Sequence, residues 1–72
     1  MTREVAIRGD SIRLGQLLKL AGVVGSGGDI KRFLGEVAVT VNGEPEARRG
    51  RQLKVGDEIG AGDERLRVVA AG

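Results

Sequence analysis

The sequence predicts an α+β fold in which two short helices pack on a small, mostly antiparallel sheet. Apolar and polar residues alternate with the period of a strand near both ends of the chain and around residues 37–41. Between residues 14 and 34, apolar residues instead recur at the spacing of a helix. Turn signals containing glycine separate these segments. Since 72 residues suit one small domain, we expect a single domain over residues 1–72.

The first half of the chain is expected to begin with a strand and a helix. The strand covers residues 4–8, where apolar residues alternate with polar ones. Asp10 or Ser11 then caps the first helix, and Gly22 ends it in a left-handed conformation. The buried face of this helix follows the i, i+3, i+4, i+7 spacing and consists of Leu14, Leu17, Leu18 and Ala21.

A second helix is expected to begin at Ser26 and to end at Gly35 after about two turns. Ser26 and Asp29 form an S-x-x-D variant of the capping box, in which side chains satisfy free amides at the start of a helix. The short apolar face of this helix consists of Ile30, Phe33 and Leu34.

The second half of the chain is expected to form strands joined by tight turns. Residues 37–41 place three valines on one side of a strand, and the Asn-Gly pair at 42–43 is a strong hairpin signal. A second turn at residues 55–57 leads into a strand near Ile59, and residues 65–70 alternate as a last strand. These strands complete the sheet on which the helices pack.

The positive charge of the chain is concentrated in its centre, although the net charge is only +2. Residues 31–54 carry six basic and three acidic residues, a net charge of +3. Residues 55–72 carry two basic and four acidic residues, a net charge of −2. A local cluster of this kind is typical of a surface that binds phosphate groups.

The residue types that most enzymes use are missing. The chain has no His, Cys or Tyr, which removes the usual general bases, thiol nucleophiles and imidazole metal ligands. The acidic pairs at residues 57–58 and 63–64 are neighbours in extended chain, so their side chains point to opposite faces. The glycine-rich residues 22–31 lack the Gly-Lys-Ser/Thr of a nucleotide loop. We therefore expect no enzymatic activity, no cofactor and no metal site.

The composition also bears on where the chain works. No apolar run approaches the roughly 20 residues that span a bilayer, so no membrane partner is expected. The absence of cysteine fits a reducing cytoplasm. We expect a cytoplasmic monomer.

Nucleic-acid binding suits the charge pattern, and the shortage of aromatic residues limits how it works. Phe33 is the one aromatic residue, and its helical spacing places it in the core. Because little else can stack on unpaired bases, we expect recognition of structured RNA through its phosphates and shape. If the second helix packs beside the segment after the hairpin, one basic patch forms from Lys31, Arg32, Arg48, Arg49, Arg51 and Lys54.

Residues 13–59 resemble the RNA-binding domain named after ribosomal small-subunit protein four, the S-four domain, and look closest to its stand-alone bacterial members. The resemblance implies the alpha-L, or S-four-like, fold and binding to structured RNA such as ribosomal or transfer RNA, on the ribosome or its assembly intermediates. It also adds Arg13 and Ser26 to the expected RNA-binding residues. The matching motifs are Arg13-Leu14, Leu18, Gly22, Ser26, Lys31-Arg32, Val39, Val41-Asn42-Gly43 and Gly56-Asp57.

Three positions depart from the pattern of that family. Gly15 stands where many members have Asp, Gly27 where many have Arg, and Val37 where Gly is usual. The stand-alone members resemble this chain in the Ser-Gly pair and in the stretch "EARRGR" at residues 46–51. The resemblance therefore implies that RNA contacts have moved from the start of the second helix toward the arginines of that stretch.

Two other interpretations of the sequence are open. A ubiquitin-like sulfur carrier of the β-grasp type resembles the chain at residues 42–44 and 56–59. Such carriers begin with a hairpin and use a C-terminal Gly-Gly, whereas one strand is expected before Leu14 and residues 70–72 are Ala-Ala-Gly. The other interpretation is a protein-interaction module that uses the basic patch on an acidic partner.

Overall fold

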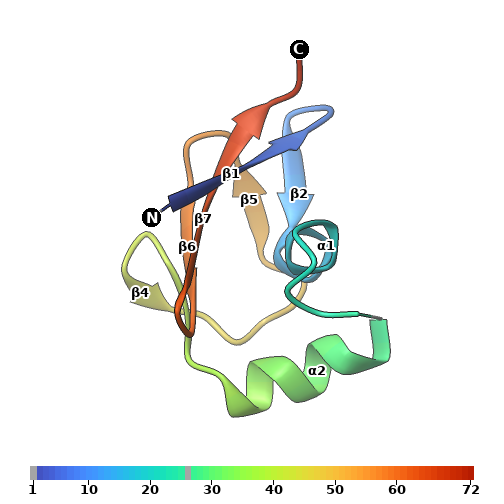
Figure 1. The fold of residues 1–72 in the computed structure, drawn as a ribbon, viewed down its shortest axis with the longest axis vertical. Helices are drawn as coiled ribbons and strands as arrows, with labels where there is room; N and C mark the ends of the chain where they lie inside the picture. Colours follow the sequence, from blue (N-terminus) through green and yellow to red (C-terminus); the bar gives the residue numbers. More distant parts are fainter. Residues whose placement is uncertain (1, 26) are drawn as a thin grey trace.

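The computed structural model describes residues 2–25 and 27–72, which form two helices and seven strands (Figure 1). The expected α+β fold, with a mostly antiparallel sheet, is confirmed. In chain order the elements are β1 (Thr2–Ile7), β2 (Ser11–Arg13), α1 (Leu14–Leu20), α2 (Gly27–Glu36), β3 (Val39–Val41), β4 (Glu44–Pro45), β5 (Gln52–Lys54), β6 (Glu58–Ala61) and β7 (Glu64–Ala70).

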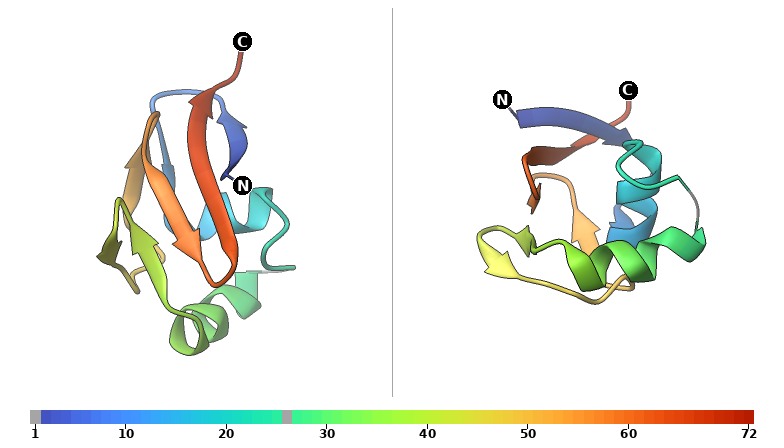
Figure 2. Two further views of the ribbon diagram at one scale, coloured as in Figure 1. Left: turned by 60° about the vertical axis from the view of Figure 1, so that its left-hand side comes forward. Right: turned by 60° about the horizontal axis from the view of Figure 1, so that its bottom comes forward.

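The main sheet joins the two ends of the chain. Within the described residues it has five strands in the order β1-β7-β6-β3-β4, and each neighbouring pair is antiparallel except the parallel pair β1 and β7. The register places Val5 opposite Val68 and Ile59 opposite Leu66, so buried side chains align across the sheet. A separate two-stranded ribbon, β2-β5, leads into α1 (Figures 1 and 2).

The start of α1 differs from the sequence-based expectation. The sequence pattern predicts a cap at Asp10 or Ser11 and one strand before Leu14, and both predictions are wrong because Ser11 begins β2. This strand pairs with β5 and not with β1, so residues 2–13 form no hairpin before the helix. Arg13 takes the N-cap position in an extended conformation, and its backbone N–H donates to Oε1 of Gln16 at 3.4 Å.

The ends of the two helices follow the sequence pattern only in part. Gly22 has a φ of 75° and its amide donates to the Lys19 carbonyl at 3.1 Å, which confirms the expected end of α1. The predicted end of α2 at Gly35 is wrong, because the helix continues to Glu36 and is ten residues long. One glycine inside a helix costs only about 1 kcal/mol, which packing of the apolar face offsets. The expected start at Ser26 lies outside the described residues.

Two turns of the sheet are locked together by side chains. Asn42 and Gly43 have φ values of 52° and 86°, so the expected tight turn between β3 and β4 is confirmed. The Asn42 amide donates to Oδ1 of Asp57 at 3.1 Å, and its Oδ1 accepts the Glu58 N–H at 2.9 Å. Oδ2 of Asp57 accepts the Lys54 N–H at 2.8 Å, which forms the second expected turn. The Asn42-Gly43 and Gly56-Asp57 motifs, which resemble the S-four pattern, therefore have a structural role.

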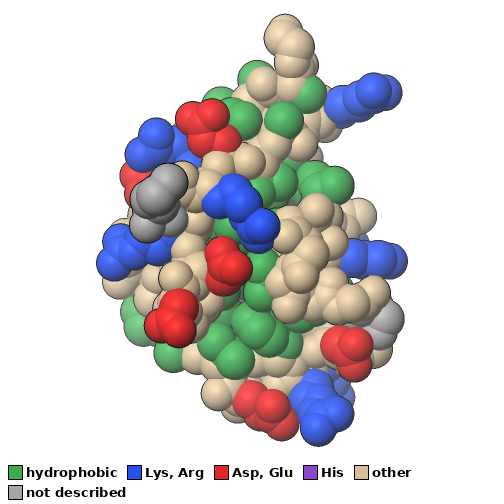
Figure 3. Space-filling model, in the orientation of Figure 1, with side chains coloured by type: hydrophobic (Ala, Val, Ile, Leu, Met, Phe, Trp, Pro, Cys, Tyr) green, Lys and Arg blue, Asp and Glu red, His purple; other side chains and the backbone are tan. Residues whose placement is uncertain are grey.

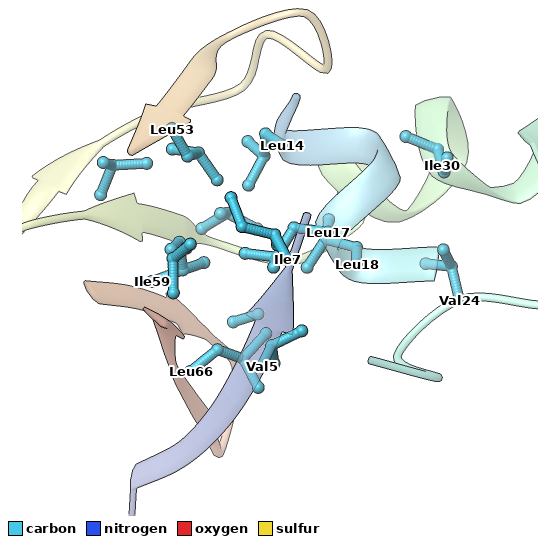
Figure 4. Close-up of a cluster of buried hydrophobic side chains, with 14 residues drawn as sticks. Val5, Ile7, Leu14, Leu17, Leu18, Val24, Ile30, Leu53, Ile59 and Leu66 are labelled. Carbon is cyan, nitrogen blue, oxygen red and sulfur yellow. The ribbon is translucent and has the colours of Figure 1, made fainter. Parts of the chain in front are cut away.

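An apolar core lies between the main sheet, α1 and the ribbon (Figure 4). Three leucines of α1 meet side chains from β1, β6 and β7, and Leu53 enters from the ribbon. Full burial of each such side chain is worth roughly 1.5–3 kcal/mol, so the core holds α1 and the ribbon firmly against the sheet. The most deeply buried side chains are Leu14, Leu17, Leu18, Val41, Leu53, Ile59, Leu66 and Val68.

Candidate nucleic-acid interface

The loop that carries the arginines, residues 46–51, is held by the first turn of α1. Helical amides of the first turn have no partner within their helix. Here the Leu14 N–H donates to the Arg51 carbonyl at 2.8 Å, and the Gly15 N–H donates to the Arg49 carbonyl at 2.9 Å. These two bonds place the arginine-bearing backbone directly against a helix that the core has already fixed.

Gly15 lets three segments meet at one point. A Cβ atom on Gly15 would lie 3.2 Å from Cγ2 of Ile30 in α2 and 3.4 Å from Cβ of Arg49 in the loop. Because the glycine leaves this space free, α2 and the 46–51 loop both approach α1 closely, and Figure 2 shows the loop running alongside α2. This gives a physical reason for glycine where many S-four domains have Asp.

Glu46 anchors the loop from inside. Its side chain is only 6% exposed, and its backbone N–H donates to the Val39 carbonyl at 2.8 Å. Oε2 accepts from Nε of Arg48 at 3.1 Å, and Oε1 accepts from Nη1 of Arg51 at 2.7 Å. Hydrogen bonds from Arg48 and then Arg51 lower the pKa of Glu46 from its ordinary value of 4.5 to about 2, so the carboxylate is charged at neutral pH.

The sequence pattern did not reveal this role of Glu46. In the sequence it is only one of the three acidic residues among residues 31–54. The carboxylate partly compensates two of the arginines expected to bind RNA. Arg48 nevertheless has a side chain that is 78% exposed, whereas the Arg51 side chain is 37% exposed. Both guanidinium groups are therefore present at the surface but held in one orientation.

Lys31 and Arg49 come together at a hollow between α2 and the loop. Among residues 2–25 and 27–72, neither side chain forms a salt bridge. Two uncompensated cations at one concave place can hold the phosphate oxygens of a polyanion. The hollow is lined by Lys31, Leu34, Gly35, Ala47 and Arg49.

Arg13 and Lys54 extend this positive surface along the ribbon. Ile12 and Leu53 are cross-strand partners whose side chains turn toward the core. Since side chains alternate along a strand, the pairs on either side, which include Arg13 and Lys54, face outward, and both residues are exposed. Arg13 directly precedes the helix turn that holds the loop, so the ribbon and the loop carry neighbouring parts of one surface.

Arg32 lies apart from Lys31, although the two are adjacent in sequence. Its Nε is 3.4 Å from Oε1 of Glu36, and it lines a different hollow together with Val23 and Phe33. The structure therefore does not bring Arg32 into the hollow that Lys31 and Arg49 share, and a role of Arg32 in RNA binding stays a prediction. Ser26, the other expected RNA-binding residue, lies outside the described residues.

The face over which β1 runs has a different character. Figure 3 shows acidic and basic side chains next to one another there. Nη2 of Arg3 lies 3.9 Å from Oε2 of Glu64. Nη2 of Arg67 lies 3.4 Å from Oε2 of Glu58, so the charges of both pairs are partly compensated. In the part of the chain that the structure describes, no helix is long and apolar enough to cross a membrane, and no group of three or more acidic side chains is placed to hold a metal ion.

Comparison with known proteins relates the chain to a protein family and to a bacterial protein. Residues 5–69 match the family model of the S4 domain. A protein of Bacillus subtilis (strain 168) named "Probable ribosome maturation protein RlbA" is 52% identical over 59 residues, which cover 82% of this chain and 83% of that protein.

Proposed function

This chain belongs to the S4 domain family, and we propose that it is a small stand-alone protein that binds structured ribosomal RNA without catalysing a reaction. The membership confirms the resemblance of residues 13–59 to the S-four domain, which is the same family. The surface proposed to bind RNA, called the basic surface below, consists of Arg13, Lys31, Arg48, Arg49, Arg51 and Lys54.

One observation carries this proposal: Lys31 and Arg49 line one hollow without an acidic partner among the described residues. The backbone of Arg49 is fastened to α1, so its side chain starts from a defined place. Because this backbone is already fixed, contact with a phosphate has to order only the Arg49 side chain. Glu46, the acid within the 46–51 loop, already forms salt bridges with Arg48 and Arg51.

The composition of the surface favours folded RNA over single strands. Phe33, the one aromatic residue, packs against the core and is partly buried, so the chain offers little aromatic surface for stacking on an unpaired base. Lysine and arginine can instead follow phosphates and 2′-hydroxyls across the wide minor groove of a stem. The Bacillus relative is named as a probable ribosome maturation protein, which supports ribosomal RNA, on the ribosome or its assembly intermediates, as the partner.

The two alternative interpretations have less support. A β-grasp sulfur carrier needs a hairpin before its first helix, whereas β1 and β2 pair with different strands. If the same surface binds an acidic protein, its complexes should survive nuclease treatment, whereas complexes that depend on RNA should not. We further propose that the chain acts as a monomer in the cytoplasm, where ribosomes are assembled.

Crosslinking in cells followed by sequencing of the bound RNA tests the proposal. We expect enrichment of ribosomal RNA segments that form stems, and loss of that enrichment when Lys31 and Arg49 are both replaced by Ala. The matched control replaces Arg65 and Arg67 by Ala, which removes the same charge from β7. Recovery of no RNA, or of messenger RNA without a preference for stems, would overturn the proposal.

A further inference from the structure

We propose that Glu46 is a positioning residue for RNA binding, so that a buried carboxylate strengthens the binding of a polyanion. The inference rests on the proposed function, because it concerns the same basic surface. The expected change in affinity has an unusual sign, because removing this negative charge weakens RNA binding.

The contacts of Glu46 occupy both of its oxygens. Oε2 accepts from the backbone N–H and the Nε of Arg48, each at 3.1 Å. Oε1 accepts from Nη2 of Arg48 at 3.3 Å and from Nη1 of Arg51 at 2.7 Å. The carboxylate thus holds one edge of the Arg48 guanidinium side-on and one end of the Arg51 guanidinium, and it sits below the surface with 6% of its side chain exposed.

The arginines keep donors for RNA after they have bound Glu46. A guanidinium has five N–H donors in a rigid plane, and Arg48 turns its Nε and Nη2 toward the carboxylate. Its remaining N–H groups are available on a side chain that is 78% exposed. Long side chains normally lose rotamer freedom when they bind. Here that freedom is already restricted before RNA arrives.

Charge counting leads to the opposite expectation. A carboxylate near a phosphate repels it, so removing an acid from the basic surface should tighten binding. This repulsion is weakened in salt, where charges are screened over about 8 Å at physiological ionic strength, and by the two guanidinium groups that cover Glu46. The two effects differ in sign, and a single substitution therefore separates them.

The fixed pair of arginines also favours one kind of RNA. Phosphates along a stem have a regular spacing, whereas those of an unstructured strand can adapt to any arrangement of cations. A rigid pair therefore gains more from a stem than a mobile pair does. If Glu46 sets this rigidity, its loss reduces the preference for a stem over a strand.

The test compares Glu46→Gln with Glu44→Gln, an exposed acid two residues away. The probes are a synthetic ribosomal RNA stem–loop and an unstructured strand of the same length. We expect Glu46→Gln to weaken stem–loop binding by roughly threefold to tenfold, the scale of ordering one or two long side chains, and to narrow the preference for the stem. Glu44→Gln should leave binding unchanged or slightly tighter.

Two further sets of variants separate positioning of the arginines from a general effect on the loop. In a background with Arg48→Ala and Arg51→Ala, Glu46→Gln should no longer weaken binding, because no guanidinium is left to position. Equal weakening in both backgrounds would mean that Glu46 only maintains the loop, and would overturn the inference. Should Glu46→Gln fail to fold, Arg48→Lys with Arg51→Lys keeps the charge but cannot rebuild the same fork, and we expect it to weaken binding.

Failure of this inference differs from failure of the proposed function. If the unaltered protein does not bind the stem–loop, the proposed function and the inference both fall. If it binds, and either Glu46→Gln tightens binding as Glu44→Gln does or the double lysine variant binds as well as the unaltered protein, only the role of Glu46 is refuted.

Discussion

Replacing Lys31 and Arg49 together by Ala should remove much of the salt-sensitive RNA binding while leaving the fold intact. Both side chains are exposed and, among the described residues, free of salt bridges. Alanine keeps the Cβ of Arg49 beside Gly15 and the carbonyl that accepts the Gly15 N–H. Exposed substitutions of this kind usually change the free energy of unfolding by less than about 0.5 kcal/mol.

The size of the effect follows from the charges on the basic surface. Two of its six cations, Arg48 and Arg51, form salt bridges with Glu46, so about four to six phosphates can be neutralised. Each neutralised phosphate contributes roughly 0.7–0.9 to the slope of log affinity against log salt, which gives a slope of about −3 to −5 for the unaltered protein. Loss of two contacts should reduce the magnitude of that slope by about 1.4–1.8.

Fluorescence anisotropy with a labelled stem–loop RNA, repeated over a series of salt concentrations, measures the slope. The control replaces Arg65 and Arg67 by Ala. This variant makes the same change in net charge on β7, outside the basic surface, and should alter the slope much less. Equal slope changes in the two variants would refute the reasoning, because binding would then depend on total charge and not on this surface.

Three further predictions concern the fold that carries the surface. Leu53→Ala should lower the free energy of unfolding by about 2–5 kcal/mol in urea denaturation, because this side chain is fully buried, and a loss below about 1 kcal/mol would contradict the core described here. Asn42→Ala should lower the free energy of unfolding by about 1–3 kcal/mol in thermal denaturation, since it removes two hydrogen bonds worth about 0.5–1.5 kcal/mol each, and an unchanged stability would contradict their role in joining the two turns. The folded-state pKa of Glu46 lies below its ordinary value, so its ion pairs stabilise the fold above pH 4.5, and this contribution is lost as the pH falls toward about 2. The Glu46→Gln variant should therefore lose less stability than the unaltered protein over that pH range. Equal loss of stability in the two proteins would count against the pairing.

The larger elements of the fold could be predicted from the sequence because each repeats a period. Alternation gave β7, helical spacing gave the buried leucines of α1, and the Asn-Gly pair gave the turn after β3. The ribbon could not be predicted in this way. Its strands β2 and β5 are three residues long, too short to show alternation, and they pair residues that are 39 or more positions apart in the chain.

The candidate site was predicted less completely than the fold, for two physical reasons. Neighbouring residues on a helix point in different directions, so Lys31 and Arg32 line different hollows, and which segment each one faces depends on tertiary packing. The burial of Glu46 could not be foreseen. A carboxylate in a loop becomes buried only because the loop folds back on β3 and α1, which depends on tertiary contacts.

Mapping of amide chemical shifts by NMR, as the labelled protein is titrated with the stem–loop RNA, tests the central claim most directly. The account predicts that the largest changes fall on Arg13, Lys31, the 46–51 loop and Lys54, with small changes at residues 58–65. Largest changes on the sheet at residues 58–65, or no changes at all, would contradict the claim that this chain binds structured RNA through its basic surface.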